Sequence, residues 1–447
     1  MKMATTADTP STAAATPRAW RAALYALPGV ILLLAALGLS LRFEPLRLGP
    51  RPIGEWVDAA QAQSLIGLAA ALTMLWLSRS ASSRVRRWGG TAAIVALLLV
   101  MLAVPLGQPI RMGDSGTYTS SRENFDFYMG ARSVRFEAHL SSMLLRGIDR
   151  GLGGTDDSPG RAFTWLTRLA ASWFTAMLLV SGWTGRWAPS TLRYLSIVIA
   201  APATLMYFGY RELGYLSLNA AVVPLVFQGF RGRRVAFEAG CALAGLGAAL
   251  HGFGLLSLAG IALATVGARV RIARRVRLLI QACAIGTSMY LIWIFVYVAG
   301  LRLEIVPGHA ESIPWRPLFD NGVGEGRINY AIGSPRGAVD VVLSTWMTGM
   351  PLALLAVPAL RRAAATAIPA LLYALPSAFF VCAFWPIQGL AVEADLLFAA
   401  FPGFFALAWV ASRSAAATWY ALPVLASAHV VFWRVMLSDL FVNSRVY

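Results

Sequence analysis

The sequence predicts an all-α, polytopic integral membrane protein with about 13 transmembrane helices and juxtamembrane surface helices in its outer loop. Hydrophobic residues make up 58% of the 447 positions and charged residues 13%, whereas soluble domains are roughly 25% charged. The apolar residues come in blocks of about 17 to 25, each long enough to cross a bilayer. Basic residues lie mainly between these blocks, and alternating the blocks across a membrane places the excess of basic over acidic residues on one side. This is the third observation that favours this class.

The N-terminal part of the chain is predicted to hold a tail and three transmembrane helices. Residues 1–19 are rich in Thr, Ala and Pro and predict a disordered cytoplasmic tail. The apolar run 24–41 is long for a signal peptide and lacks a clear small-x-small cleavage site, which favours a retained first span. With further spans near 62–79 and 91–107, it forms the predicted N-terminal unit, residues 20–107.

The rest of the chain is predicted to alternate between helices and outer loops. An outer loop at 108–161 precedes the transmembrane helices of 162–300, a second outer loop fills 301–337, and C-terminal helices occupy 338–447. Within these units the apolar runs predict spans near 162–182, 192–209, 214–230, 236–250, 253–268, 278–300, 338–358, 364–384, 395–411 and 417–436.

The basic residues predict an orientation. Alternating the spans from an inside N-terminus gives one face 20 basic and 2 acidic residues and the other face 18 and 19, so the net charges of +18 and −1 add to +17. The first face collects Lys2, Arg18, Arg21, Arg79–Arg87, Arg186–Arg193, Arg231–Arg234, Arg269–Arg277, Arg361–Arg362 and Arg413. Because cytoplasmic loops carry the excess of Lys and Arg, we expect a bacterial cytoplasmic (inner) membrane protein with its long loops outside.

Several function classes are disfavoured. The arginines are dispersed over short loops rather than gathered on one face, so the net charge of +17 does not predict a nucleic-acid partner. The cytoplasmic loops hold no Walker or Rossmann motif for a nucleotide. Cys241, Cys283 and Cys382 lie inside apolar runs without metal-ligand spacing. No metal site or cofactor is therefore predicted, and a divalent cation is left open.

The outer loop at 108–161 is far longer than a turn between helices requires. Its apolar residues recur at helical spacing and arginines fill most of the other positions, which predicts surface helices over residues 125–149. We expect the arginines to lie near lipid headgroups and the apolar side to face lipid or the protein core. The apolar positions are Phe125, Met129, Phe136, Leu140 and Leu144, and the arginines are Arg132, Arg135 and Arg146.

Asp114 is the leading candidate for catalysis. It lies in Gly113-Asp114-Ser115-Gly116, at the start of the large outer loop. A carboxylate at a membrane boundary can have its pKa moved toward the working pH and act as a general base. The alternative is a turn-capping aspartate, because Asp favours turns.

A second acid, Glu212, lies beside Arg211 in a nearly loop-free outer turn between the spans 192–209 and 214–230. Ionisable groups at membrane depth are costly and usually serve a function. The interpretation as a second catalytic acid competes with a structural ion pair between Arg211 and Glu212.

Other outer residues are candidates for substrate binding. His251 ends a run of small residues, where it serves either as a substrate contact or as part of a tight turn. Cations that suit a phosphate group lie in or near the second outer loop: Arg302, His309, Arg316 and Arg327. Glu393 and Asp395 open the span 395–411, where acids two positions apart diverge on a helix, so one substrate contact is favoured over a metal pair.

This arrangement resembles the GT-C superfamily of polytopic glycosyltransferases, which use polyprenyl-phosphate-linked sugars on the outer face. In that superfamily the first large outer loop carries a catalytic Asp or Glu and then juxtamembrane helices, and a second acid commonly follows in the next outer loop. Gly113-Asp114, the run Phe125–Ile148 and Glu212 match this order. The chain departs from the pattern because its large loop follows the third span rather than the first. Glu55 and Asp58, in the loop 42–61, are therefore rival acids.

The resemblance implies that Asp114 deprotonates an acceptor hydroxyl, which attacks and inverts the anomeric carbon while the lipid phosphate leaves toward arginines. The implied partners are a polyprenyl-phosphate-linked sugar, a lipid or glycan acceptor and membrane lipids. Two other classes stay open: a polysaccharide polymerase or ligase acting on lipid-linked glycans, and a transporter. The nearly charge-free centres of the spans disfavour the transporter. A non-catalytic assembly or anchoring role also remains.

Overall fold

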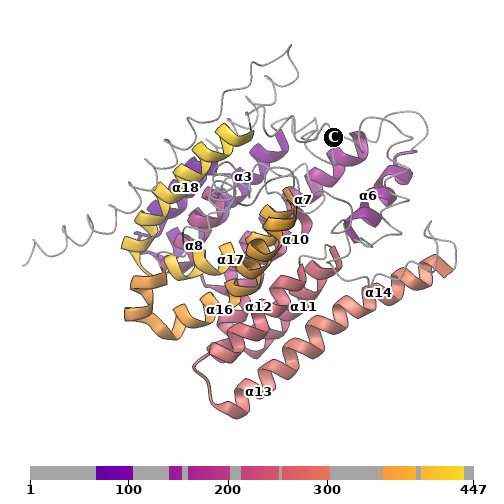
Figure 1. Ribbon diagram of the computed structural model, residues 1–447. Helices are drawn as coiled ribbons and strands as arrows, with labels where there is room; N and C mark the ends of the chain where they lie inside the picture. The colour runs from indigo at the N-terminus through magenta and orange to yellow at the C-terminus, as the bar shows by residue number, and fades with distance from the viewer. Residues whose placement is uncertain are drawn as a thin grey trace, which may run out of the picture.

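The described part of the chain is entirely helical. The computed structural model describes residues 67–103, 140–153, 160–201, 213–250, 254–302, 352, 356–388 and 394–436. No strand occurs among these residues, so the all-α prediction is confirmed for them (Figure 1). The predicted spans 24–41 and 338–358 lie outside them, apart from residues 352 and 356–358. Every other predicted span coincides with a helix over most or part of its length.

The helices follow one another with short connections at one end. The N-terminal half contains a helix at Gly67–Leu77, then α3 (Ser83–Ala103), α6 (Leu140–Gly151), α7 (Gly160–Thr184), α8 (Pro189–Ala200) and α10 (Leu213–Phe230). The C-terminal half contains α11 (Arg234–Leu250), α12 (Gly254–Gly267), α13 (Ile272–Gln281), α14 (Thr287–Arg302), α16 (Ala356–Gln388), α17 (Ala394–Ala411) and α18 (Ala415–Met436). A π-helical turn, Ala282–Gly286, joins α13 to α14 into one rod.

Two predicted boundaries are wrong. Helix α8 ends at Ala200 and Ala201 is extended (φ −71°, ψ 126°), so the predicted span 192–209 does not continue as one helix; residues 202–209 lie outside the described residues. Proline at the next position, Pro202, explains this end because its ring disfavours helical backbone in the residue before it. The predicted inner loop at Arg361–Arg362 is instead part of the 33-residue helix α16. Its local sequence is rich in Ala, Leu and Arg, which favour helix, and contains no glycine that would end one.

One continuous helix among the described residues is long and apolar enough to cross a membrane: Ile272–Val296. The other apolar helical stretches among the described residues are shorter: Gly67–Leu77, Leu218–Phe230, Gly254–Gly267, Ala364–Phe380, Ala400–Ala411 and Ala415–Ala428. The topology of about 13 spans therefore stays a prediction.

The core lies between the middle helices. α10 packs against α7 and α11, and α12 packs against α11 and α16, which in turn packs against α17. The largest fully buried side chains are Trp187, Tyr194, Phe237, Tyr373 and Trp409. α11 also approaches the π-helical turn closely, because a Cβ atom at Gly245 would lie 2.4 Å from the carbonyl oxygen of Gly286. Glycine at this position lets two backbones touch.

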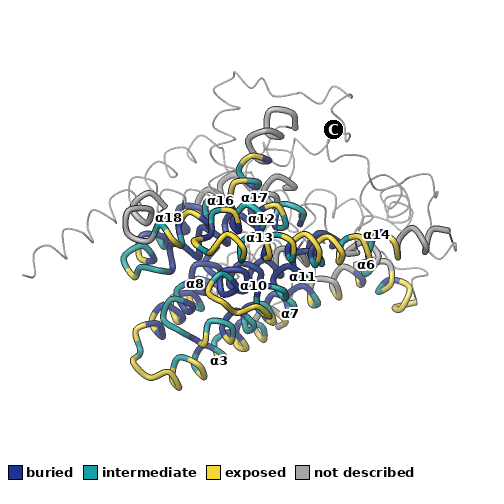
Figure 2. Tube along the Cα trace, turned by 90° about the horizontal axis from the view of Figure 1, so that it is seen from below, coloured by how far each residue is buried: buried dark blue, intermediate teal, exposed yellow. Residues whose placement is uncertain are grey.

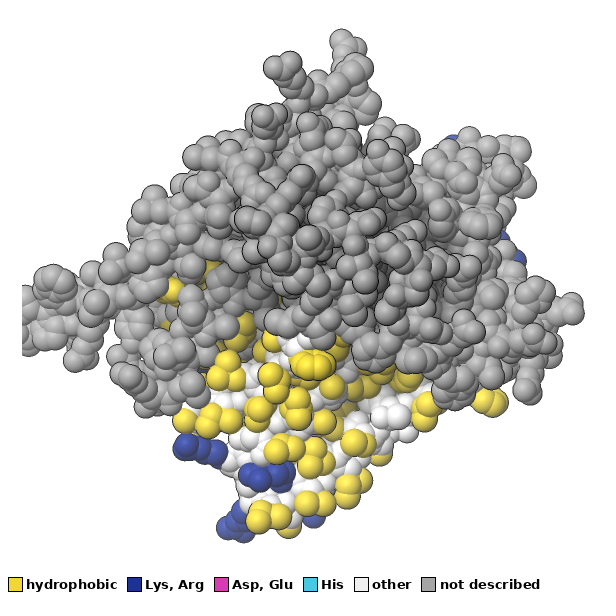
Figure 3. Space-filling model, in the orientation of Figure 1, with side chains coloured by type: hydrophobic (Ala, Val, Ile, Leu, Met, Phe, Trp, Pro, Cys, Tyr) yellow, Lys and Arg dark blue, Asp and Glu magenta, His cyan; other side chains and the backbone are white. Residues whose placement is uncertain are grey.

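The outer helices expose large apolar side chains. Figure 2 shows burial concentrated on α8, α10 and α11, while α3 and α13 carry many exposed positions. The visible described face in Figure 3 is mainly hydrophobic, with Lys and Arg side chains along its lower rim. The exposed apolar residues on α13, α14 and α16 include Ile272, Val276, Ile280, Leu291, Ile292, Phe295, Val296, Leu375 and Phe379.

Candidate functional site

Most of the predicted site residues lie outside the described residues. This applies to Asp114, Arg211, Glu212, His251, His309, Arg316, Arg327 and Glu393, and to the rival acids Glu55 and Asp58. Two others are placed on helices, although their side chains are not described: Arg302 is the last residue of α14 and Asp395 the second residue of α17. The structure therefore brings no two of the predicted side chains together, and their common site stays a prediction.

The helix predicted within 125–149 is confirmed for residues 140–149, whereas its place at a membrane surface stays a prediction. Helix α6, Leu140–Gly151, carries an apolar side on which Leu145 is fully buried and Leu144 packs against the core. Gly147, Arg150 and Gly151 are exposed on the other side. α6 packs against α7 and also contacts α11. Residues 125–139 lie outside the described residues.

Asp149 is a buried carboxylate that the sequence prediction missed. It is 4% exposed and lies on the side of α6 that faces the protein. The signal was present in the spacing, because Asp149 follows Leu145 by four positions and therefore shares its helical face. Burying a carboxylate is costly unless it is paired or hydrogen-bonded, so such groups are selected for a structural or a chemical role. Asp149 is thus a described acid within the predicted outer loop.

Neutral polar groups link the helix centres. Ser257 on α12 donates a hydrogen bond to Oδ1 of Asn219 on α10 (2.7 Å). Ser181 on α7 and Tyr194 on α8 both donate to the carbonyl oxygen of Ala220 on α10 (2.7 and 3.0 Å). These bonds join helices without bringing a charge into the core, which is the usual use of Ser and Asn between packed apolar helices.

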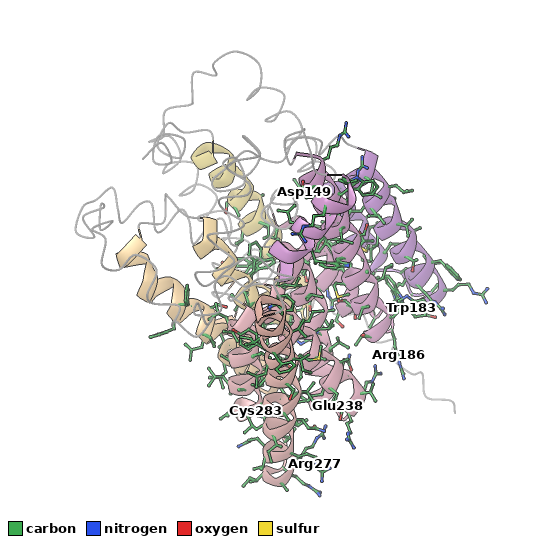
Figure 4. All side chains as sticks on the ribbon, turned by 90° about the vertical axis from the view of Figure 1, so that its right-hand side faces the viewer. Asp149, Trp183, Arg186, Glu238, Arg277 and Cys283 are labelled. Carbon is green, nitrogen blue, oxygen red and sulfur yellow. The ribbon has the colours of Figure 1, made fainter. Side chains whose placement is uncertain are left out.

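The opposite end of the bundle is basic, and we call it the arginine end (residues 79–87, 184–193, 228–234, 268–277 and 411–419). Figure 4 shows Asp149 near one end of the bundle and Arg186 and Arg277 near the other. Loops predicted to share a face contact one another here: Arg86 Nε donates to the carbonyl of Trp187 (3.1 Å) and Arg193 Nε to that of Ser412 (2.8 Å). Stacking adds to this, because the guanidinium carbon of Arg87 lies 4.1 Å from the ring centroid of Trp183.

Arginines at this end cap helix C-termini. Arg233 donates to the carbonyl of Thr184, the last residue of α7 (3.0 Å). The Nη2 atom of Arg274 donates to the carbonyl of Gly229, in the last turn of α10 (2.9 Å). These carbonyls have no partner within their own helices, and a cation there also offsets the negative end of the helix dipole. Arg233 and Arg274 therefore have structural roles.

The acid of the arginine end is already paired. Glu238 on α11 accepts from Arg234 Nε (2.7 Å) and from Gln281 Nε2 (3.0 Å). Among the described residues no group of three or more His, Cys, Asp or Glu side chains is arranged to hold a metal ion.

The described helices form an all-α bundle with a basic end and with Asp149 buried toward the other end. No protein-family model matches this chain, and no curated protein matches it in sequence. Its function therefore has to be inferred from its own residues.

Proposed function

We propose that the chain is a polytopic membrane glycosyltransferase of the GT-C type. It transfers a sugar from a polyprenyl-phosphate donor to a lipid or glycan acceptor on the outer face of the bacterial cytoplasmic membrane. The observation that carries the proposal is α6: an amphipathic helix in the predicted outer loop holds a buried carboxylate, Asp149, away from the arginine end.

A membrane setting is supported by the exposed surface. Phe295 on α14 is 75% exposed and Phe379 on α16 is 70% exposed. An exposed surface made of many large apolar side chains is expected to be covered by a partner or by lipid. The arginine end lies at the rim of this face, as positively charged cytoplasmic loops do in membrane proteins. The Asp149 end is then the outer end.

The proposed reaction uses the carboxylates of the large outer loop. Asp114 takes the proton from the acceptor hydroxyl as its oxygen forms a bond to the anomeric carbon, and the bond from that carbon to the lipid phosphate breaks. The departing phosphate needs charge neutralisation, which arginines of the outer loops supply. Asp149 supports the site by binding the donor or by holding α6 against α7 and α11.

The test is sugar transfer by full-length variants at matched protein level in a strain that lacks the native gene. Asp114→Asn keeps size and hydrogen bonding but cannot accept a proton, so activity should fall by about 10²–10⁴-fold. Asp149→Asn should raise the KM for the donor or lower activity, with less effect on the chemical step. Glu238→Gln removes a carboxylate at the arginine end and serves as the matched control.

Near-normal transfer by Asp114→Asn would remove Asp114 from the mechanism and move the catalytic role to Glu212, or to Glu55 and Asp58. A turn-capping role predicts that outcome, since Asn caps turns as readily as Asp. A product that requires an oligosaccharide-diphosphate donor would instead identify a polymerase or ligase.

A further inference from the structure

Side chains of α8 and α10 and the guanidinium group of Arg413 pack around Trp409, in the last turn of α17. Its indole ring is 2% exposed and is contacted by Tyr194 of α8 (ring centroids 5.5 Å apart, planes at 81°) and by Phe227 of α10 (5.7 Å). The guanidinium carbon of Arg413, just beyond the end of α17, lies 3.7 Å from the centroid of the same ring. Trp409 thus fixes Arg413 beside α8 and α10.

Two further arginines, Arg193 and Arg231, lie close enough to Arg413 for their positive charges to act on it. Arg193 adjoins Tyr194 and donates its Nε hydrogen bond to the carbonyl of Ser412 (2.8 Å), the residue before Arg413. Arg231 follows Phe230, whose ring packs against Phe227 (5.5 Å). Arg193 and Arg413 thus lie together at the end of α17, while Arg231 is exposed and belongs to the turn after α10.

Arg413 has hydrogen-bond donors that the protein does not use. Its Nε and Nη2 atoms are buried and have no hydrogen-bond partner. The two acids with described side chains are engaged elsewhere or distant, because Glu238 pairs with Arg234 and Asp149 lies toward the opposite end. Buried donors without acceptors are rare and costly. Two adjacent donors on one guanidinium edge have the geometry that binds an oxyanion bidentately.

The charge of Arg413 is also disfavoured by its surroundings. Burial, and then the positive charges of Arg231 and Arg193, lower the pKa of Arg413 from its usual value. A cation whose pKa falls on folding costs stability at every pH below its folded pKa, which includes neutral pH. A bound anion would offset this cost because it attracts all three arginines.

We propose that Arg193, Arg231 and Arg413 form a phosphate-binding site at the arginine end. The ligand is a phosphate group, either of an anionic phospholipid headgroup or of free phosphate. Its tetrahedral oxygens can accept from several guanidinium groups at once, which a planar carboxylate does less well. The site lies at the end away from Asp149 and goes beyond the proposed sugar transfer.

The experiment uses the full chain in nanodiscs and does not depend on sugar-transfer activity. Thermal unfolding is measured in phosphatidylcholine alone, in phosphatidylcholine with phosphatidylglycerol, and in phosphatidylcholine with inorganic phosphate against chloride at equal ionic strength. The variants are R413Q and R231Q. R84Q removes an exposed arginine of the same end and is the matched control.

Wild type and R84Q should gain thermal stability with phosphatidylglycerol or phosphate, and R413Q and R231Q should lose most of that gain. Binding in each of the two variants should weaken at least about tenfold. A response to phosphatidylglycerol alone identifies a lipid headgroup, and a response to both probes identifies the phosphate group itself. Arg231 is exposed, so R231Q decides the question if R413Q does not fold. Equal gains in wild type and R231Q, or no gain in wild type with either probe, would overturn the proposal.

Discussion

Trp187 fills a slot between α3 and α7 that two glycines leave open. Its side chain is 2% exposed, and a Cβ atom at Gly90 or Gly182 would lie 2.5 or 2.6 Å from its ring. Arg186 and Trp187 both have left-handed backbone (φ 54° and 52°), which costs non-glycine residues roughly 1–2 kcal/mol each. Burial of the indole offsets this cost. The left-handed turn between α7 and α8 therefore depends on the slot that admits the indole, and the slot is filled only because the turn places Trp187 there.

Gly182→Ala tests this dependence. The new methyl group has no room beside the rigid indole, so we expect overpacking to destabilise the protein by about 1–3 kcal/mol. The measurement is thermal unfolding of the full chain in detergent. Gly147→Ala on α6 is the matched control, because nothing lies within 4 Å of a Cβ atom there. That substitution should be neutral or slightly stabilising. Equal losses of stability in the two variants would contradict the packing of Trp187 against Gly182.

At the scale of the element, α6 is positioned by one narrow apolar side. Leu145 is fully buried, while Leu152, just beyond the helix, is 43% exposed. A helix of 12 residues is marginal by itself in water. Its contacts with α7 and α11 therefore decide whether α6 forms and where Asp149 lies.

Leu145→Ala should loosen α6 from the bundle. A buried Leu→Ala change typically costs about 2–5 kcal/mol, and we expect much of this loss to appear as local opening rather than global unfolding. Amide hydrogen exchange over residues 140–151 measures it. Leu152→Ala should leave exchange unchanged. If both variants exchange like wild type, Leu145 does not hold α6.

The contacts at the arginine end illustrate what sequence patterns could and could not predict. The periodicity predicted helices and the charge count predicted which loops share a face. The partner of Arg193, the carbonyl of Ser412, is 219 positions away, and no local pattern indicates such a contact. Helix α8 ends at Ala200, just before Pro202, which is earlier than the long apolar run predicts.

At the scale of the whole molecule, the loops around Arg86, Arg193, Arg233 and Arg274 lie together at one end. This agrees with the alternation of helices that the charge count predicts. If this end is cytoplasmic, a cysteine at position 155 should react with an impermeant thiol reagent from outside and one at position 273 should not. The test uses intact cells and a background without the native cysteines, with labelling after lysis as the control for reactivity. The opposite pattern would refute the proposed outer-face chemistry.

Within the described residues, composition and periodicity by themselves determined the helical class, most of the segments that form helices and the grouping of the basic loops. These follow from local spacing and from summed charge, which are readable along the chain. Tertiary structure alone decided that Trp187 fills a glycine slot and that Arg413 stacks on Trp409 beside Arg193. The physical reason is that burial and unmet hydrogen bonds depend on which distant helices meet, and residue spacing in the sequence carries no record of that.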